Sequence, residues 1–265
     1  MSPLTNYKIA IFTRSANYKL YKMSDNTLKL PFKHYRFTFT TAHGYIYKIL
    51  KYNIDYAINI DEDAFVVDNK ALIDLLNYCI TEKIVNCGMR DGGVLPIRYG
   101  NPVVTNPFFN ILDVKEIRKN FSQEKINKYR DKEIDYDTLF SNIKFSYKYK
   151  ISSDYEPYYP FFLWLNTNYK VYYLNVAEHK DKLSTILYNQ EGAEILYHSW
   201  YSREYEKDIF HTQRIKDLYH LCSSTDISLS TFEKFKIWIE LQLNKKIIPL
   251  LLPVRRIVLK QIKIK

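Results

Sequence analysis

The pattern of apolar residues predicts four short strands in the first third of the chain. Residues 8–12 form an apolar, β-branched run that ends at polar Thr13, which is typical of a buried parallel strand followed by a loop. Residues 35–40 alternate between polar and apolar side chains with the period of a strand. Residues 56–60 and 84–88 are further short apolar runs, and we expect each to be a strand.

Segments with helical periodicity separate these runs. Residues 44–52 and residues 69–82 both place apolar side chains at helical spacing, and Asp68 stands where an N-cap is expected. The side chains on the apolar face of the second helix are Leu72, Leu75, Leu76 and Cys79. Strands that alternate with helices predict an α/β domain with a mostly parallel sheet flanked by helices.

The middle of the chain combines a long loop with polar helical segments. Residues 91–110 are rich in glycine and proline, and a loop of that length is usually functional. Residues 113–150 have a polar helical character, residues 158–165 form an aromatic apolar helix or strand, and residues 170–174 form a strand.

The C-terminal part is predicted to be a helical appendage. Ser230, with Glu233 three residues later, makes a capping box for a helix from residue 231 to residue 243. We therefore expect one catalytic domain over residues 1–204, followed by helices and a basic segment over residues 205–265.

The positive charge is concentrated in one segment. The formal charge is +10, and residues 245–265 carry seven basic residues and no acidic one. Residues 1–244 hold 32 basic against 29 acidic side chains. A nucleic-acid-binding protein carries its basic face on the folded domain, so we expect no nucleic-acid partner. Residues 245–265 indicate either contact with an anionic membrane surface or a helix packed on the catalytic domain.

From the sequence we expect no signal for export. No segment reaches the about 20 apolar residues that a membrane span needs, and the first residues lack the pattern of a secretory signal. Cys79, Cys87 and Cys222 have neither zinc nor disulfide spacing and are expected to be free thiols. We expect a cytoplasmic protein, held at the inner face of the membrane if the basic segment contacts a bilayer.

The candidate chemistry lies directly after the third predicted strand. In an extended chain Asp61 and Asp63 project to the same side, whereas Glu62 faces the other side. In open α/β sheets, ligands bind beyond the carboxyl ends of the strands. Two carboxylates at that place favour Mg²⁺ or Mn²⁺, cations that also bind substrate phosphates. The alternative is an acidic turn that caps a helix.

An apolar strand leading into Asp-x-Asp, at residues 58–65, resembles the metal-binding motif of glycosyltransferases with the GT-A fold. Two later segments extend the likeness: a Gly-rich loop at residues 90–93 followed by residues 106–110, and a late histidine within residues 197–203. The resemblance implies a GT-A-like (Rossmann-like) fold in which Asp61, Asp63 and His198 hold Mn²⁺ or Mg²⁺. It further implies a nucleotide-sugar donor and a glycan or lipid-linked acceptor, in bacterial surface polysaccharide synthesis.

The sequence departs from the family at one point. About 50 residues separate the first strand from the acidic motif, which is fewer than the family commonly has. One βαβ unit takes roughly 30 residues, so the missing length is on the scale of a whole unit. We therefore expect part of the nucleotide-binding half to be abbreviated.

Six residues are candidates for substrate binding. Arg14 ends the first strand, where a base or phosphate is reached, and the planar fork of Arg203 suits a diphosphate. Each of these arginines could equally be a surface residue. The remaining candidates, from the acidic motif, the Gly-rich loop and the histidine segment, are Glu62, Arg90, Gly92 and Trp200.

Transfer with inversion needs a base that deprotonates the acceptor hydroxyl. Glu156 is the first candidate and Asp154 the second, because both precede an apolar segment in the way of the family's acidic residue. Asp91 in the Gly-rich loop is the third. The alternative role for Asp154 is N-capping, since Pro157 suits the first turn of a helix.

A metal-dependent glycosyltransferase is the function that these features favour. A sugar nucleotidyltransferase would use the same nucleotide and metal, but it carries a Gly-rich loop after the first strand, where residues 13–17 have no glycine. A phosphatase of the haloacid-dehalogenase type also has Asp-x-Asp after a strand, with Thr or Val where Phe65 stands. A non-catalytic module that binds membranes or nucleic acid is the remaining alternative.

Overall fold

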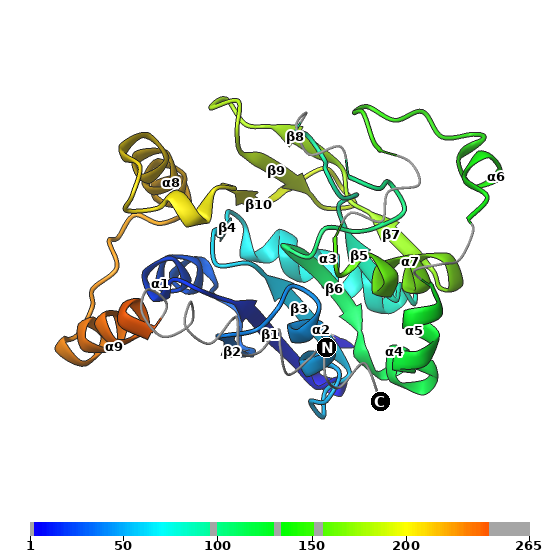
Figure 1. Ribbon diagram of the computed structural model, residues 1–265, viewed down its shortest axis with the longest axis horizontal. Helices are drawn as coiled ribbons and strands as arrows, with labels where there is room; N and C mark the ends of the chain where they lie inside the picture. Colours follow the sequence, from blue (N-terminus) through cyan, green and yellow to red (C-terminus); the bar gives the residue numbers. More distant parts are fainter. Residues whose placement is uncertain (1–2, 96–99, 130–133, 151–155, 244–265) are drawn as a thin grey trace, which may run out of the picture.

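The computed structural model describes residues 3–95, 100–129, 134–150 and 156–243 (Figure 1). Asp154 and residues 245–265, which the sequence singled out, lie outside these ranges. Among the described residues, no helix combines the length and the apolar character that crossing a membrane requires.

A six-stranded sheet forms the centre of the molecule, in the order β2-β1-β3-β6-β5-β7. The pairs β2–β1, β1–β3 and β5–β7 are parallel, and β6 runs antiparallel to both of its neighbours. The strands are β1 (Ile9–Arg14), β2 (Lys33–Phe37), β3 (Tyr56–Ile60), β5 (Asn86–Gly88), β6 (Phe109–Asp113) and β7 (Val171–Tyr173). The predicted α/β class, a mostly parallel sheet flanked by helices, is confirmed.

Alternate side chains of the central strands enter two cores, one on each face of the sheet. In β1, Ala10 and Phe12 point into one core, whereas Ile9 and Ile11 point into the other, as the period of a strand requires. The first core is closed by α2 (Gly44–Ile49), α4 (Val114–Asn120), α5 (Gln123–Tyr129) and α7 (Tyr159–Asn168).

The second core lies between the sheet, α3 (Asn69–Thr81) and a smaller antiparallel sheet (Figure 1). This smaller sheet has the order β4-β10-β9-β8. Its strands are β4 (Ala64–Val66), β8 (Val176–Glu178), β9 (Thr185–Tyr188) and β10 (Glu194–His198). Because β4 follows β3 after three residues, the acidic motif connects the two sheets.

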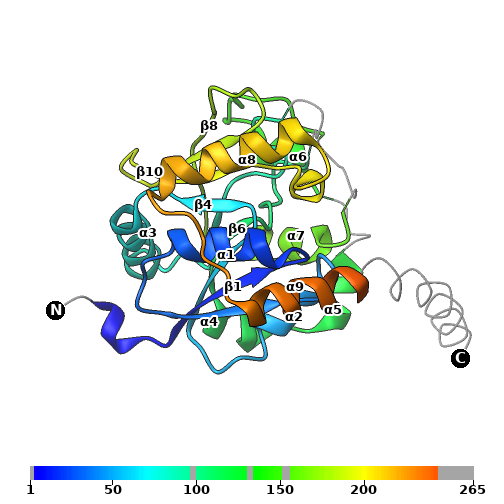
Figure 2. The ribbon, with the colours of Figure 1, turned by 90° about the vertical axis from the view of Figure 1, so that its left-hand side faces the viewer.

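The C-terminal helices pack beside α1 (Tyr18–Thr27), on the face that Figure 2 turns toward the viewer. Leu20 and Met23 of α1 share a small core with Ile215 and Leu218 of α8 (Ile209–Cys222) and with Phe65 of β4. Helix α9 (Thr231–Gln242) follows after a short linker. The short elements that complete the chain are η1 (Pro3–Asn6), α6 (Tyr136–Phe140) and η2 (Ser202–Glu204).

The predicted helix ends are confirmed by their caps. Asp68 accepts hydrogen bonds from the Lys70 and Ala71 N–H groups at the start of α3. Ser230 and Glu233 form the reciprocal capping box of α9. The segment 158–165, for which the sequence allowed a helix or a strand, forms the N-cap and the first part of helix α7.

Candidate metal centre

The acidic motif forms a tight turn between the two sheets. The Asp61 N–H donates to the Phe108 carbonyl at 2.7 Å, which continues the β3–β6 pairing for one more residue. The Ala64 N–H then donates to the Asp61 carbonyl at 3.2 Å and closes the turn. The backbone of the motif is therefore held by both sheets, and its side chains lie where the sheets meet.

Strand β10 brings His198 to this turn. In the antiparallel β4–β10 pair, His198 lies opposite Ala64. The Ser199 N–H donates to the Asp63 carbonyl at 3.0 Å and extends the pairing into the turn. The chain therefore places a histidine beside Asp63 across 135 positions of sequence.

The three side chains that were predicted as metal ligands converge. The potential ligand atoms of Asp61, Asp63 and His198 lie within 4.8 Å of one another. His198 Nε2 is 3.2 Å from Asp63 Oδ1, and the Ser199 hydroxyl donates to Asp63 Oδ2 at 3.2 Å. Asp63 and His198 are only 2% and 3% exposed, so the site is desolvated at its base.

The two carboxylates experience different electrostatic environments. Burial raises the pKa of Asp61; Arg14 opposes this shift, and the nearby charge of Asp63 adds to it. Burial also acts against ionisation of Asp63, but the charge and hydrogen bond of His198 outweigh it and lower the pKa of Asp63. The raised pKa of Asp61 reflects negative charge crowded into a buried space, which a divalent cation would relieve.

The donor set fits a divalent cation. Carboxylate oxygens suit Mg²⁺ and Mn²⁺, and a neutral imidazole nitrogen shifts the preference toward Mn²⁺. Aromatic side chains fix the plane of the imidazole: the Phe108 ring stacks on it at 3.9 Å between centroids, and the Trp200 ring lies 4.2 Å from it. Among the described residues, His198 Nδ1 is buried without a hydrogen-bond partner. The ring is therefore oriented by packing and not by a second polar group.

Arg14 faces this cluster from the carboxyl end of β1. Burial lowers the pKa of its guanidinium, but Asp61 and other nearby acids outweigh the burial and raise it. The guanidinium also lies over the Tyr45 ring, 5.7 Å from its centroid. The positively charged Arg14 side chain therefore lies next to the predicted metal ligands.

Glu62 points away from the cluster, on the side that strand alternation predicts. Its carboxylate accepts the Asn17 N–H at 2.7 Å, next to the N-cap of α1. Burial raises the pKa of Glu62 to about 8. In this arrangement Glu62 holds the loop that directly follows Arg14 at the end of β1.

The Gly-rich loop is tied to the cluster through one asparagine. Asn106 donates from its amide to the buried carboxylate of Asp91, and its amide oxygen accepts the Phe108 N–H at 3.1 Å. Phe108 in turn stacks on His198. Tyr158 and Tyr159 also donate to Asp91, so the start of α7 is fixed to the same carboxylate.

Other predicted substrate-binding residues lie around this framework. The Arg90 guanidinium is 3.6 Å from the centroid of the Tyr173 ring and donates to the Pro102 carbonyl at 2.5 Å. Gly92 has a φ of 92°, in the left-handed region that favours glycine. These contacts give Arg90 and Gly92 a part in shaping the loop.

The segment after β10 contains two more of the predicted residues. Trp200 donates from its indole nitrogen to the Thr185 hydroxyl at 2.9 Å, which keeps its ring beside His198. Arg203 is exposed on η2. Glu156 lies three residues before the start of α7, and its carbonyl accepts the Tyr159 N–H at 3.0 Å.

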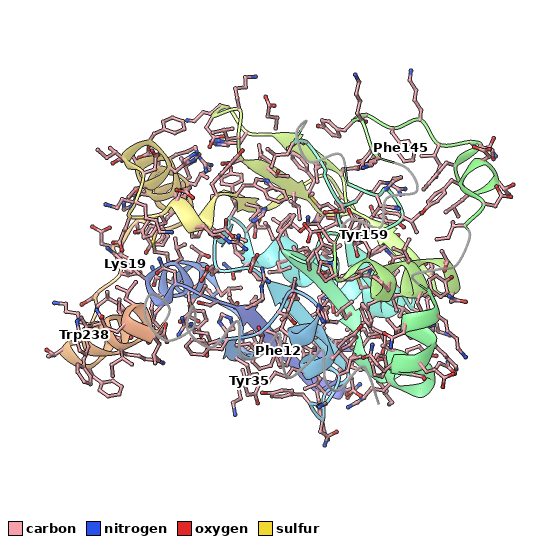
Figure 3. All side chains as sticks on the ribbon, in the orientation of Figure 1. Phe12, Lys19, Tyr35, Phe145, Tyr159 and Trp238 are labelled. Carbon is pink, nitrogen blue, oxygen red and sulfur yellow. The ribbon has the colours of Figure 1, made fainter. Side chains whose placement is uncertain are left out.

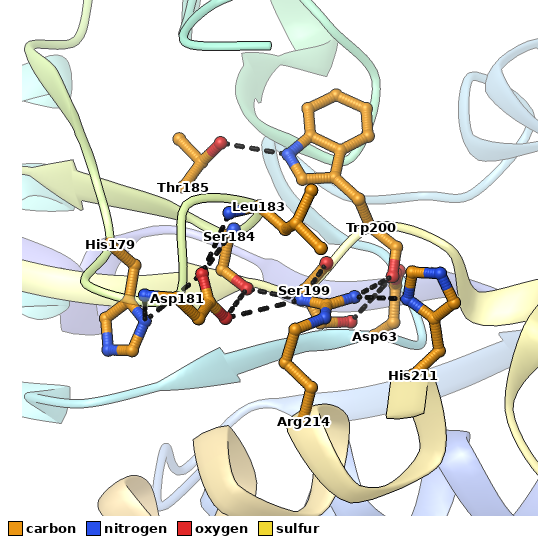
Figure 4. Close-up of polar contacts among 10 residues, drawn as sticks. All are labelled: Asp63, His179, Asp181, Leu183, Ser184, Thr185, Ser199, Trp200, His211 and Arg214. Atoms are coloured by element: carbon orange, nitrogen blue, oxygen red, sulfur yellow. Dashed lines mark hydrogen bonds and ion pairs between the residues drawn. The ribbon is translucent and has the colours of Figure 1, made fainter. Parts of the chain in front are cut away.

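Arg214 is a supporting residue that the sequence did not single out. This arginine of α8 is 5% exposed and donates to the Ser199 carbonyl and the Ser184 hydroxyl, each at 2.6 Å (Figure 4). It also reaches the Trp200 carbonyl at 3.3 Å. Helix α8 thereby holds the turn that follows His198. The sequence offered one signal for this role: Arg214 is a charged residue that stands next to Ile215 on the apolar face of α8.

Comparison with solved structures gives remote likenesses. No family model and no curated protein matches the sequence. The structure is similar to that of A197 from STIV, with 10% identity, 71% of this chain and 93% of that chain covered, and a TM-score of 0.38. It is also similar to mannosyltransferase PcManGT from Pyrobaculum calidifontis in complex with GDP-Man and Mn²⁺, with 6% identity and a TM-score of 0.33. That match covers 43% of this chain and 46% of the other. Likenesses this remote do not bear on function.

Proposed function

We propose that this protein is a metal-dependent glycosyltransferase, with a GT-A-like catalytic domain, that moves a sugar from a nucleotide-diphosphate sugar to a glycan or lipid-linked acceptor. The observation that supports it is the convergence of Asp61, Asp63 and His198 within 4.8 Å, at the carboxyl end of a central strand. Ligands of open α/β sheets bind at that edge, and the candidate ligands there suit divalent cations, which also bind diphosphates.

In this proposal each group has a defined task. Asp61, Asp63 and His198 would hold a divalent cation, which when bound would neutralise the negative charge that develops on the departing nucleoside diphosphate. Arg14 binds a phosphate or the base from the end of β1, and Arg203 pairs with the diphosphate. Glu62 and Arg90 position the loops that line the donor site. Trp200 and Gly92 line the place where the sugar and the acceptor meet.

The proton of the acceptor hydroxyl goes to a carboxylate. We assign this role to Glu156 first, to Asp154 second and to Asp91 third. Asp91 already accepts hydrogen bonds from Asn106, Tyr158 and Tyr159. Its oxygens are therefore engaged in holding the loop to α7, which agrees with its place as the third candidate.

The product of the reaction distinguishes the proposed function from its rivals. The purified protein is incubated with single nucleotide-diphosphate sugars and mixed glycan acceptors, in Mn²⁺ or in EDTA, and the released species is identified by chromatography. A glycosyltransferase releases a nucleoside diphosphate, and the release stops in EDTA and resumes when Mn²⁺ is added. A nucleotidyltransferase, run on a sugar phosphate and a nucleoside triphosphate, releases pyrophosphate instead.

Matched variants connect the activity to the site. Asp63→Ala is expected to abolish the release of nucleoside diphosphate. Asp74→Ala, which alters an acid on the surface of α3 that pairs with Lys70, is expected to retain it. Equal turnover of the Asp63→Ala variant, or full turnover in EDTA, would contradict the proposed function.

A further inference from the structure

Helix α9 displays apolar side chains to solvent. Phe232, Phe235, Trp238 and Ile239, which we call the α9 stripe, are 75%, 55%, 57% and 37% exposed. Their spacing puts them on one side of the helix. Figure 3 shows Trp238 at the outer edge of the molecule.

The opposite side of α9 is fixed to the body by charged contacts. Glu240 receives two hydrogen bonds from Arg36 of β2, at 2.6 and 2.8 Å. Glu233 accepts the Tyr18 hydroxyl at 3.0 Å and pairs with Lys22 at 3.3 Å, both on α1. These contacts fix the rotation of the helix about its axis. Because they hold one side of α9 against the body, the stripe on the other side faces solvent.

This orientation reverses that of an ordinary surface helix, which buries its apolar side and exposes its charges. Here the acids Glu233 and Glu240 turn inward, and three aromatic rings turn outward. Contiguous exposed apolar surface of this kind marks a site that contacts another molecule or a membrane. Phe235 and Trp238 also stack on each other, with ring centroids 6.0 Å apart, so they form one continuous aromatic surface.

Charge indicates what covers the stripe. Lys234 is exposed on α9, and residues 245–265, which follow the helix closely in sequence, add seven basic residues without an acid. An aromatic, apolar helix face that is followed in sequence by a basic segment has the composition of segments that lie in the headgroup region of an anionic bilayer. A second copy on the stripe would pair two chains that each carry a formal charge of +10, and their repulsion opposes that arrangement.

We infer that the α9 stripe docks this protein on the surface of an anionic lipid bilayer, with the aromatic rings at the level of the headgroups. The inner position of Glu233 and Glu240 keeps negative charge away from that surface. The inference concerns where the protein is held, and it stands or falls independently of the reaction that the Asp61 cluster carries out.

Vesicle sedimentation with the full chain tests the inference. We expect binding to vesicles of phosphatidylglycerol and phosphatidylcholine, and much weaker binding to vesicles of phosphatidylcholine alone. Phe235→Ser with Trp238→Ser is expected to reduce the affinity for the anionic vesicles at least tenfold. The matched control, Leu139→Ser with Ile143→Ser, removes two exposed apolar side chains elsewhere and is expected to bind as the wild type does.

Every outcome decides the matter. Circular dichroism first checks that each variant is folded. Wild-type protein that does not bind anionic vesicles, or a stripe variant that binds as well as the control, would overturn the inference. Light scattering covers the remaining alternative: self-association of the wild type that the stripe variant abolishes would assign the surface to a second copy and would also overturn it.

Discussion

His198 Nε2 lies 3.2 Å from Asp63 Oδ1, and the antiparallel pairing of β4 with β10 makes this contact. The candidate metal centre therefore depends on both sheets. Asp61 and Asp63 follow β3 of the larger sheet, and His198 ends β10 of the smaller sheet. Anything that shifts β10 relative to the turn is expected to alter the site.

Arg214→Ala is expected to lower the free energy of unfolding by about 3 kcal/mol, because it leaves the Ser199 carbonyl and the Ser184 hydroxyl without their buried partner. It is also expected to weaken Mn²⁺ binding about tenfold, since supporting residues orient metal ligands. Urea unfolding and a Mn²⁺ titration measure the two effects. Lys216→Ala on the same helix is the control. An Arg214→Ala variant that is as stable as this control and binds Mn²⁺ as tightly would refute the role of Arg214.

His198→Asn is expected to change the choice of metal. The substitution replaces a nitrogen ligand by an amide oxygen on a shorter arm, so Mn²⁺ affinity falls at least tenfold and Mg²⁺ affinity much less. It also removes a ring from the Phe108 stack, at a cost of about 1 kcal/mol. Isothermal titration with each metal gives the ratio. An unchanged ratio, equal to that of the exposed His220→Asn control, would show that His198 is no ligand.

Glu62→Gln is expected to remove part of the pH dependence of stability in EDTA. The pKa of Glu62 is raised from 4.5 to about 8 by burial, so between these values the folded protein holds a proton that the unfolded chain has lost. The free energy of unfolding therefore falls as the pH rises through this window. Glutamine has no such transition, and at pH 8 we expect the variant to gain about 3–4 kcal/mol over the wild type, relative to pH 5.

The difference between the two unfolding curves is the quantity to measure, because Asp61, whose pKa is also raised, contributes equally to both. Glu124→Gln, which changes a 75% exposed acid, serves as the control. Parallel curves for Glu62→Gln and the wild type would mean that Glu62 is ionised in the folded protein.

Glu240→Gln is expected to loosen α9 without unfolding the domain. It removes the charge from a bidentate pair with Arg36, whose side chain is 8% exposed, and such hydrogen bonds contribute about 2 kcal/mol. Faster amide hydrogen exchange confined to α9 is the expected result. The surface pair of Glu116 with Lys119 provides the control, because Glu116→Gln should change exchange very little. Unchanged exchange in α9 would show that other contacts hold the helix.

The sequence predicted the elements that have strong local signals. The third predicted strand matches β3 at both ends, and the helix capped by Asp68 matches α3 to within one residue. The capping box of α9 was readable for the same reason, since capping depends on side chains only three residues apart. For these segments, local pattern and final structure agree.

The elements that were missed depend on distant partners. Strand β6 begins inside the segment that composition assigned to a loop, and its place between β3 and β5 stabilises it there. Helix α1 buries two polar residues, Ser24 and Thr27, beside Leu20 and Met23, so its apolar periodicity is weak. The Thr27 hydroxyl accepts the Val66 N–H at 2.9 Å, a contact between segments far apart in sequence.

The candidate site was also predicted only in part. Alternation along an extended chain placed Asp61 and Asp63 together and turned Glu62 away, as the structure has them. The part played by Arg214 could not be predicted, because it depends on how α8 lies against the turn after β10. Nor could the sequence show that α9 is anchored by its acids and faces solvent with its aromatic rings.

Direct measurement of Mn²⁺ binding by electron paramagnetic resonance tests the central claim most closely. Free Mn²⁺ gives a sharp six-line signal that is lost on binding, so a titration counts the sites without any assumption about substrate. We predict one site per chain, tightened by a nucleoside diphosphate and absent in Asp63→Ala, while Asp74→Ala retains it. Equal Mn²⁺ binding by the Asp63→Ala variant and the wild type would contradict the assignment of Asp61, Asp63 and His198 as a metal centre.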